Sequence, residues 1–250
     1  HERLSRGLSL RTEELTLIKN GERIWSNIAI SPILSGTGEL TNTVTVLADV
    51  TSSKIHEVLQ FCILDAMVRE KPLEAVMDLV CSEVERIAPE VKASVIQVDE
   101  DGCMHLLSAP SLPATYAKII EGMSISDCIG SSSTAAFLGE SVVTSDIETD
   151  STWAVIRDDF LPLGINSCWS TPIKGAKGVS IGVLAFYYDE KRIPSPLHQQ
   201  MVDVITPLCA LAMEREANQE NIRKLAFYDS LTELPNRSLL HAKADHALIE

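Results

Sequence analysis

The chain has 250 residues, 45% of them apolar, which is enough for one large domain or two ordinary ones with a hydrophobic core. It carries 21 Lys and Arg against 35 Asp and Glu, a net charge of -14, and it has no basic run, so binding to a nucleic-acid backbone is not expected. No apolar stretch approaches the ~18 residues of a membrane span and no signal segment is present, so we expect a cytoplasmic protein with no membrane partner.

The first fifty residues are predicted to form three antiparallel strands, at 11–19, 22–34 and 40–50. Apolar and polar residues alternate in these segments, and Asn20-Gly21 is a dipeptide that favours a tight hairpin turn. Three such strands are too few to close a core on their own.

A helix is predicted to follow at residue 51, where the apolar period changes and Thr51 can act as an N-cap. The segments NGERIWSNIAISPI and VTVLADVT resemble the last hairpin of a PAS domain, and Asp49 and Thr51 fall where PAS domains lead into an exit helix. The resemblance implies that residues 1–51 are the C-terminal strands of a PAS domain and that 52–71 are a linker helix. The alternative is an unrelated hairpin.

Residues 72–188 are predicted to form an α+β domain in which helices flank a central antiparallel sheet. A helix begins at Pro72 and should end at Pro89, and further helical segments are expected at 114–120 and 153–160. The predicted strands are 93–98, 103–108, 141–144, 167–174 and 179–188.

Three segments in this region resemble consecutive blocks of the bacterial GAF family, which occurs in sensory and cyclic-di-GMP proteins. They are GSSSTAAFLGESVVTSDIETDSTWAVIRD, GINSCWSTPIKG and GVLAFYYDEKRIPSP, in the family's order and spacing. The resemblance implies a GAF domain over residues 72–214.

The small-residue turn at 130–134 is the candidate wall of a ligand pocket. Gly130 lets the backbone approach a ligand, and Ser131 or Ser132 is expected to cap a helix that begins near Thr134. Free amides at this turn would suit a small polar or anionic ligand of unknown identity, and nearby aromatic residues could line the cavity. The alternative is that these residues only cap a helix and pack in the core. The candidate ligand-binding residues are Cys128, Gly130, Ser131, Ser132, Ser133, Thr134, Trp153 and Trp169.

No catalytic or metal site is expected from the sequence. The six cysteines lack the spacing of a zinc site or a disulfide framework. His56, His105 and His198 lie far apart with no acidic partner at a useful spacing, which favours surface or structural roles. Cys128 lies close to where free methionine sulfoxide reductases of the GAF fold carry redox cysteines, so the resemblance leaves a cysteine-dependent reductase as an alternative.

The last helix carries apolar residues at alternating spacings of three and four from Met201 to Leu225, the pattern of a two-stranded coiled coil. Its first half, up to about residue 214, is expected to pack on the GAF sheet, and residues 215–226 to form a signalling linker. Arg215 and Asn218 interrupt the apolar seam and should weaken it. We expect a parallel homodimer through helices at 51–70 and 201–225.

The segment LAFYDSLTELPNR resembles the opening of a GGDEF domain, which implies that residues 227–250 begin one. Glu233 stands where that family usually has Gly, and the loop that holds metal and GTP in the family is absent from these residues. We therefore expect a piece of a longer PAS-GAF-GGDEF(-EAL) protein that makes or degrades cyclic-di-GMP, with no catalytic residue in this piece. The matching residues are Asp229, Leu231, Thr232, Leu234, Pro235, Asn236 and Arg237.

The expected function is a regulatory sensor module that relays a small-molecule or redox signal to the GGDEF domain. No cofactor is expected in these residues, and the resemblance places a haem or other PAS ligand, if the parent has one, upstream of them. The alternatives are the reductase and a dimerisation spacer that senses nothing.

Overall fold

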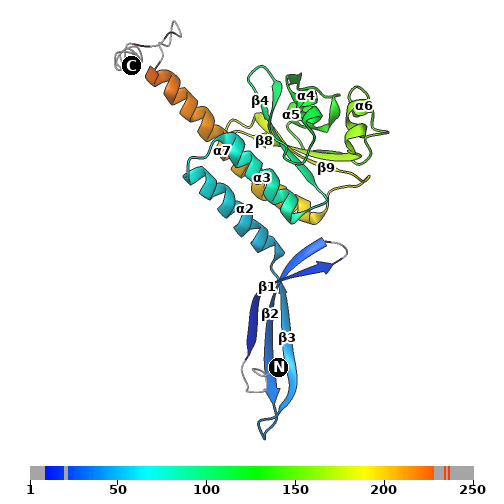
Figure 1. The fold of residues 1–250 in the computed structure, drawn as a ribbon, viewed down its shortest axis with the longest axis vertical. Helices are drawn as coiled ribbons and strands as arrows, with labels where there is room; N and C mark the ends of the chain where they lie inside the picture. The colour runs from blue at the N-terminus through cyan, green and yellow to red at the C-terminus, as the bar shows by residue number, and fades with distance from the viewer. Residues whose placement is uncertain (1–8, 20–21, 228–233, 235, 237–250) are drawn as a thin grey trace.

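The computed structural model describes residues 9–19, 22–227, 234 and 236 (Figure 1). Along the chain these residues form a small three-stranded sheet, a group of long helices and a six-stranded sheet that carries shorter helices on its other face. Within them, no helix has the length and apolar character that crossing a membrane requires.

The first sheet has the order β1-β2-β3 and is antiparallel throughout, as predicted. Its strands are β1 (Leu10–Lys19), β2 (Glu22–Leu34) and β3 (Leu40–Asp49). Side chains on both faces of β3 are exposed, including the apolar Val44, Val46 and Leu47. Among the residues of this sheet whose burial is described, only Ser26 is buried, as expected for three strands that do not close a core.

Helix α2 (Thr51–Val68) begins directly after β3, but Thr51 does not cap it as predicted. Val50 is the N-cap residue, and the Thr51 hydroxyl instead accepts the backbone N–H of Trp25 at 2.9 Å. The carboxylate of Asp49 accepts the backbone N–H of Thr51, also at 2.9 Å. Thr51 is nearly buried, so its side chain is used to fasten β2 to the start of the helix.

The second sheet has the order β6-β5-β4-β9-β8-β7 with antiparallel neighbours, so the predicted α+β class is confirmed. Side chains alternate between its faces: Leu184 and Phe186 lie on one face, and Val183 and Tyr187 lie on the other. The strands are β4 (Lys92–Val98), β5 (Cys103–Ser108), β6 (Met123–Ser124), β7 (Val142–Thr144), β8 (Ser167–Lys174) and β9 (Ser180–Tyr188).

Long helices cover the first face of this sheet. Helices α3 (Leu73–Ile87) and α7 (Pro196–Phe227) lie against the strands, and α2 packs on both of them (Figure 1). A Cβ atom at Gly182 on β9 would lie 2.6 Å from the carbonyl oxygen of Ile96 and 2.8 Å from the terminal methyl of Met213. Glycine at this position therefore allows α7 to approach the sheet closely.

Short helices cover the second face, where a separate apolar cluster forms around Tyr116, Trp153, Phe160 and Tyr187. The predicted helical piece at 153–160 is divided into short turns rather than one helix. The elements on this face are α4 (Ala114–Ile120), α5 (Gly130–Leu138), η1 (Ser151–Trp153), α6 (Arg157–Phe160) and η2 (Leu161–Leu163).

The C-terminal part of α7 extends beyond the rest of the domain (Figure 1). Its buried residues end at Met213, and every residue from Glu216 to Phe227 is exposed. Apolar side chains in this region, such as Ile222 and Leu225, are 66% and 74% exposed.

Candidate functional site

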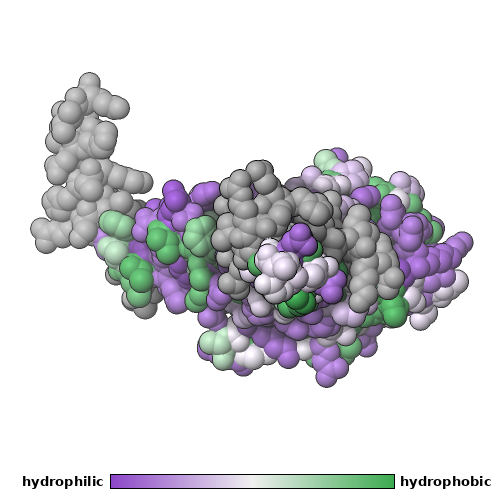
Figure 2. Space-filling view, turned by 90° about the horizontal axis from the view of Figure 1, so that it is seen from below, coloured by the Kyte–Doolittle hydropathy of each residue, from purple (hydrophilic) through white to green (hydrophobic). Residues whose placement is uncertain are grey.

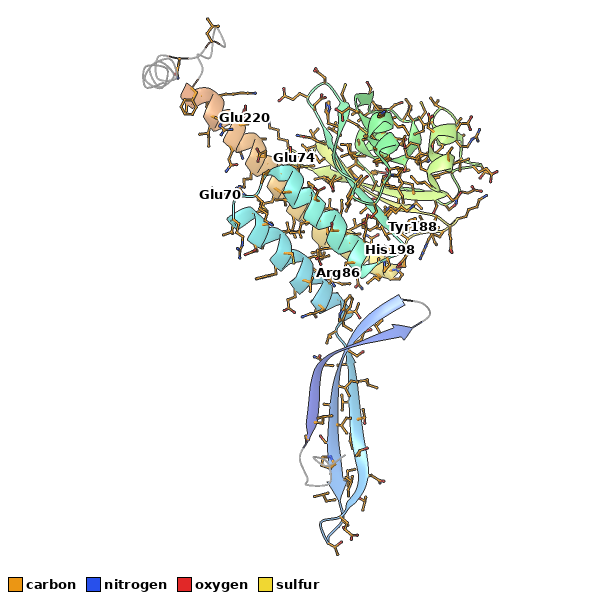
Figure 3. The ribbon with its side chains drawn as sticks, in the orientation of Figure 1. Glu70, Glu74, Arg86, Tyr188, His198 and Glu220 are labelled. Carbon is orange, nitrogen blue, oxygen red and sulfur yellow. The ribbon has the colours of Figure 1, made fainter. Side chains whose placement is uncertain are left out.

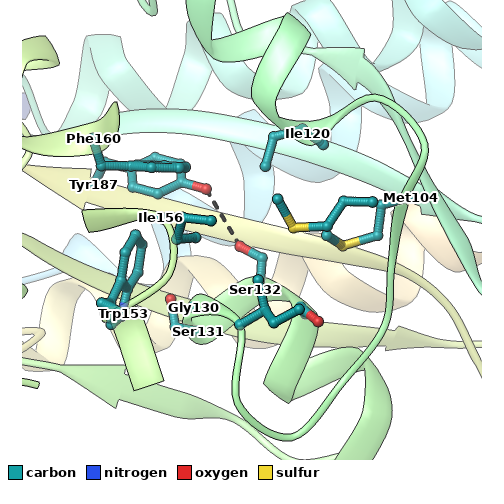
Figure 4. A pocket seen from close by; sticks show the side chains of 12 residues that line it. Met104, Ile120, Gly130, Ser131, Ser132, Trp153, Ile156, Phe160 and Tyr187 are labelled. Atoms are coloured by element: carbon teal, nitrogen blue, oxygen red, sulfur yellow. Dashed lines mark hydrogen bonds between the residues drawn. The ribbon is translucent and has the colours of Figure 1, made fainter. Parts of the chain in front are cut away.

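A small cavity lies on the second face of the sheet, between α5, the η1–α6 segment and β9 (Figure 4). Its volume is about 10 Å³, close to the least that holds one water molecule. The lining side chains are mostly apolar, with serines at the start of α5 and the phenol of Tyr187 as the polar exceptions. The lining residues are Met104, Ile120, Met123, Ile129, Gly130, Ser131, Ser132, Ser133, Trp153, Ile156, Phe160 and Tyr187.

The start of α5 differs from the prediction. The helix begins at Gly130 rather than near Thr134, its N-cap is Ile129, and no side chain caps it. Gly130 has φ +65°, and a Cβ there would lie 2.7 Å from the Cδ1 atom of Ile156. Only glycine fits this combination of backbone conformation and contact without strain. The serines predicted to be caps therefore lie inside the helix, where their hydroxyls are free for other partners.

Those hydroxyls belong to a buried network that crosses the central strands β4, β9 and β8. Neighbouring atoms in it are 2.8 to 3.3 Å apart, and Figure 4 shows the link between Ser132 and Tyr187. In order, the groups are Ser94 Oγ, Tyr116 Oη, Tyr187 Oη, Ser132 Oγ, Ser170 Oγ, Ser131 Oγ and Cys168 Sγ.

The network is uncharged at neutral pH. Burial raises the pKa of the Cys168 thiol to about 12, and it raises the pKa of the Tyr116 and Tyr187 phenols above their ordinary value. None of the described residues that line the cavity is charged. The side chains thus favour a small neutral ligand with hydrogen-bonding capacity over the anion that the free amides suggested.

The predicted site residues divide between the two faces of the sheet. Trp153 lines the cavity and donates its indole N–H to the Thr144 hydroxyl at 3.0 Å. Trp169 lies on the opposite face, where its ring meets that of Phe186 edge-on at 5.8 Å. Trp169 belongs to the core between the sheet and the long helices, and it does not line the cavity.

The other two predicted residues also lie off the cavity wall. Thr134 is buried and donates its hydroxyl to the carbonyl of Gly130. Cys128 is exposed, and its sulfur is 3.3 Å from the Ser126 hydroxyl. Neither residue is among those that line the cavity.

The histidines have acidic partners that the sequence did not reveal. His105 lies 2.7 Å from a carboxylate oxygen of Glu121 and 2.9 Å from one of Asp99, and His198 lies 3.0 Å from Glu90. His198 and Glu90 are 108 positions apart, so only the fold brings them together. The structural roles predicted for these two histidines are consistent with such pairs. Within the described ranges, no three or more histidine, cysteine or acidic side chains converge as metal ligands would.

Two ion pairs connect the residues just before η1 to the loop between β9 and α7. Lys191, in the loop between β9 and α7, lies 3.0 Å from Asp146 and 2.9 Å from Glu148, which precede η1. The guanidinium of Arg157 donates to the Glu148 carbonyl at 2.7 Å. A displacement of the η1–α6 segment would therefore act on the loop that leads into α7.

Arg215 has a partner inside the chain. Its guanidinium donates to the carbonyl of Met67 near the C-terminal end of α2, which also accepts the backbone N–H of Glu70. Glu70 has φ +54°, an unfavourable conformation for a residue with a side chain. Arg215 thus holds α7 to the turn between α2 and α3, a role that the seam pattern did not predict.

Of the residues that match the opening of a GGDEF domain, the structure describes Leu234 and Asn236, and the others lie outside the described residues. Asn236 donates its backbone N–H to the carbonyl of Phe227 and its side-chain amide to that of Ala226, each at 2.8 Å. These bonds are made to the carbonyls that the end of α7 leaves free.

Comparison with protein families shows a match to the model of the GAF domain over residues 70–214. This is more than half of the chain and includes both faces of the six-stranded sheet.

Two characterised proteins are similar over most of the chain. The oxygen sensor protein DosP of Escherichia coli is 23% identical over 233 residues, 93% of this chain and 23% of that protein. The methyl sulfide methyltransferase-associated sensor of Methanosarcina acetivorans is 27% identical over 206 residues, 81% of this chain and 19% of that protein. The chain thus spans about a quarter or less of the length of either protein.

Among solved structures, the GAF domain of a phosphoenolpyruvate-protein phosphotransferase from Coxiella burnetii superposes with a TM-score of 0.57. The likeness covers 68% of this chain and 96% of that domain at 14% identity. At this identity the likeness bears on the fold alone.

Proposed function

Because this chain belongs to the GAF domain family, we propose that it is a regulatory sensor module that relays a small-molecule or redox signal to a GGDEF output domain, or to GGDEF followed by EAL. The output would control the synthesis or hydrolysis of cyclic-di-GMP. The chain itself would supply no catalytic residue to that reaction.

One observation carries the proposal: the candidate site and the candidate output helix lie on opposite faces of one sheet and meet through β9. Tyr187 lines the cavity, whereas Phe186 and Tyr188 on the same strand pack under α3 and α7. Helix α7 then continues toward the residues that resemble the opening of a GGDEF domain. A ligand that enlarged the cavity would displace β9 or the η1–α6 segment. Strand β9 packs under α7, and the ion pairs of Lys191 connect the residues before η1 to the loop that leads into α7.

Both similar proteins are named as sensors, which supports a sensory role for this chain. The PAS assignment for residues 1–51 rests on the hairpin that resembles that family and is part of the proposal. So is the GGDEF assignment for residues 227–250, which rests on the LTELPNR segment.

Haem does not fit the cavity as it stands. The volume of about 10 Å³ is close to the least that holds one water molecule, and neither histidine nor cysteine is among the described lining residues. Any haem or other PAS ligand of the parent protein would be held by residues upstream of this chain.

We also propose that two chains associate in parallel through α2 and α7. The outward side chains of Phe61 and Val68 on α2, and of Leu211, Ile222 and Leu225 on α7, are between 48% and 81% exposed. Figure 2 shows apolar side chains beside the grey C-terminal residues, on the side of the molecule where α2 and α7 lie. Residues 211, 218, 222 and 225 follow the spacing of a coiled-coil seam, and pairing would remove these side chains from water.

The relay can be tested by joining the chain through Arg237 to a GGDEF domain of known cyclase activity. Ser132→Phe would fill the cavity from the start of α5, whereas Ser141→Phe would place the same side chain at an exposed position. We expect the cyclase rate to change with Ser132→Phe and not with Ser141→Phe. Equal rates in both variants would favour the dimerisation spacer.

A further inference from the structure

A buried histidine holds the first turn of α7 in place. Helix α7 begins at Pro196, and His198, its third residue, is 0% exposed (Figure 3). The His198 backbone N–H lies 3.4 Å from the Ser195 hydroxyl, and the Ser195 backbone N–H donates to His198 Nδ1 at 3.2 Å. The Ser195 carbonyl accepts the N–H of Gln199, as that of an N-cap residue does.

This arrangement is a reciprocal capping box. In such a box the N-cap hydroxyl accepts the backbone N–H of the third helical residue. The side chain of that third residue accepts the backbone N–H of the N-cap residue. Glu or Gln usually occupies the third position, and here an imidazole replaces it. Unlike Gln, an imidazole can lose its acceptor by gaining a proton near neutral pH.

The surrounding groups define the protonation state that the box requires. Because Nδ1 accepts a backbone N–H, the ring proton lies on Nε2, which donates to Glu90 at 3.0 Å. Tyr188 Oη lies 3.1 Å from Nδ1, and burial raises the pKa of this phenol, so it stays protonated and can share the Nδ1 lone pair with the Ser195 N–H. The neutral ring therefore has a partner for each of its nitrogens.

Protonation would turn Nδ1 from an acceptor into a donor. The new N–H would face the N–H of Ser195, so the capping bond would be lost, and Tyr188 Oη could accept a hydrogen bond from the new N–H. Two charged groups face the cluster: the Glu90 carboxylate, which favours the imidazolium, and the Arg192 guanidinium, 5.1 Å from the centre of the Tyr188 ring, which disfavours it. The positive end of the α7 dipole also disfavours it.

We propose that the Ser195–His198 capping box is a proton-sensitive fastening of α7. When His198 is neutral the box closes the first turn of α7, and when His198 is protonated the bond from the Ser195 N–H to Nδ1 is lost while the Nε2–Glu90 contact to the loop after α3 remains. The fastening lies at the end of the helix layer opposite to Glu70 and Glu220 (Figure 3). Its consequence for signalling rests on the proposed relay through α7, whereas the protonation step does not.

The step can be measured by recording ¹⁵N–¹H spectra of the whole chain between pH 8 and pH 5. We expect the backbone amide resonance of Ser195 to titrate together with the imidazole resonances of His198. His198→Gln keeps an acceptor in the box and cannot titrate, so the Ser195 resonance should become independent of pH. The matched control His56→Gln removes an exposed histidine on α2 and should leave the titration unchanged.

A second variant covers the case in which His198→Gln fails to fold. Glu90→Gln keeps an acceptor for Nε2 but removes the negative charge, so the Ser195 midpoint should move to lower pH. A Ser195 resonance that is constant while His198 titrates, or that still titrates in His198→Gln, would overturn the inference, as would a His198 that does not titrate in this range. If the Ser195 titration is found but the fused cyclase ignores Ser132→Phe, the relay fails and the proton-sensitive box stands.

Discussion

Tyr187 is the residue at which the cavity and the buried hydroxyl network meet. Its hydroxyl lies 2.8 Å from Tyr116 Oη and 3.3 Å from Ser132 Oγ, and its ring packs against Phe160 and Tyr116. Every group of the network is buried, so each hydroxyl that loses a partner would remain out of water.

The network should therefore be sensitive to the loss of single hydroxyl groups. We expect Tyr116→Phe and Tyr187→Phe each to lower the free energy of unfolding by about 1–3 kcal/mol, since each leaves a buried partner with one bond fewer. Because both mutations remove the same contact, the double variant should cost less than the sum of the two. Urea denaturation of the four chains gives this coupling energy, and strict additivity would contradict a shared hydrogen bond.

His105, a partly exposed residue of β5, offers a pH-dependent test of stability. Hydrogen bonds to Glu121, and secondarily to Asp99, raise the pKa of its imidazole. The stabilisation that His105 adds to the folded chain is present in full below the pKa of an unfolded histidine, about 6.5. It is lost as pH rises through the raised pKa of His105 in the folded chain. The pKa values of Asp99 and Glu121 are lowered, chiefly by His105, so their part is lost as pH falls below about 4.

We accordingly predict that His105→Gln destabilises the chain most between about pH 4.5 and pH 6.5, and has little effect near pH 9. Thermal unfolding across this range would measure the difference from the unmodified chain, with His56→Gln as the control. A difference that grew with rising pH would have the wrong sign. The effect should be small, because all three side chains are more than a third exposed.

At the scale of single residues, the sequence predicted the cavity-lining side chains better than it predicted the hydrogen-bond partners of buried groups. Of the predicted residues, Gly130, Ser131, Ser132, Ser133 and Trp153 line the cavity, and their binding of a ligand stays a prediction. Trp169 was misplaced because a strand presents alternate residues to opposite faces, and local pattern does not say which face is the cavity. The tyrosines of the network were missed because each resembles an ordinary core residue until the strands are aligned.

The helices are the elements whose roles changed most between sequence and structure. Their positions follow from apolar spacing, and α3 covers the predicted face with Val76, Val80 and Val84. The start of α5 was placed four residues late because Gly130 and three serines suggest a turn, whereas tertiary contacts keep them helical. Similarly, Arg215 interrupts an apolar seam in sequence, and its bond to Met67 becomes visible only when α2 and α7 are packed together.

Arg215 and Asn218, both predicted to weaken the seam, therefore have different expected effects when each is replaced by Leu. Asn218 is exposed on the free part of α7, so Asn218→Leu should tighten the dimer, by up to about tenfold in Kd for 1.4 kcal/mol of apolar burial. Arg215→Leu extends the same seam but removes the donor to Met67, so it should also lower the stability of each chain by about 1 kcal/mol. Sedimentation gives the first quantity and urea denaturation the second.

The two single variants serve as controls for each other, and the double variant should combine both effects. Wild-type and doubly substituted chains that both remain monomers at high micromolar concentration would rule out the proposed seam. Equal stability of the Arg215→Leu and Asn218→Leu chains would instead argue against the clamp on α2.

At the scale of the whole molecule, we propose a regulatory role in which this chain supplies no catalytic residue to the output reaction. In this proposal residues 227–250 resemble the opening of a GGDEF domain, and the reaction belongs to that output domain. The purified chain should neither form cyclic-di-GMP from GTP nor hydrolyse it. Chromatographic analysis after long incubation with Mg²⁺ would detect turnover, and any turnover that followed the chain through purification would contradict the domain assignment.

The central claim is that a change in the cavity is transmitted to α7. Trp153→Ala would remove an indole ring from the cavity wall, and added indole could then occupy the vacated space. Spin labels at the exposed Lys118 on α4 and Glu220 on α7 report the distance across the sheet within one chain, once Cys62, Cys103 and Cys128 have been replaced by serine.

The decisive measurement is the distribution of that distance by double electron–electron resonance, with and without indole. We predict that indole shifts the distribution in the Trp153→Ala chain and leaves it unchanged in the chain that keeps Trp153. An unchanged distribution in the Trp153→Ala chain, with indole shown to be bound by calorimetry, would contradict the claim that α7 responds to the cavity.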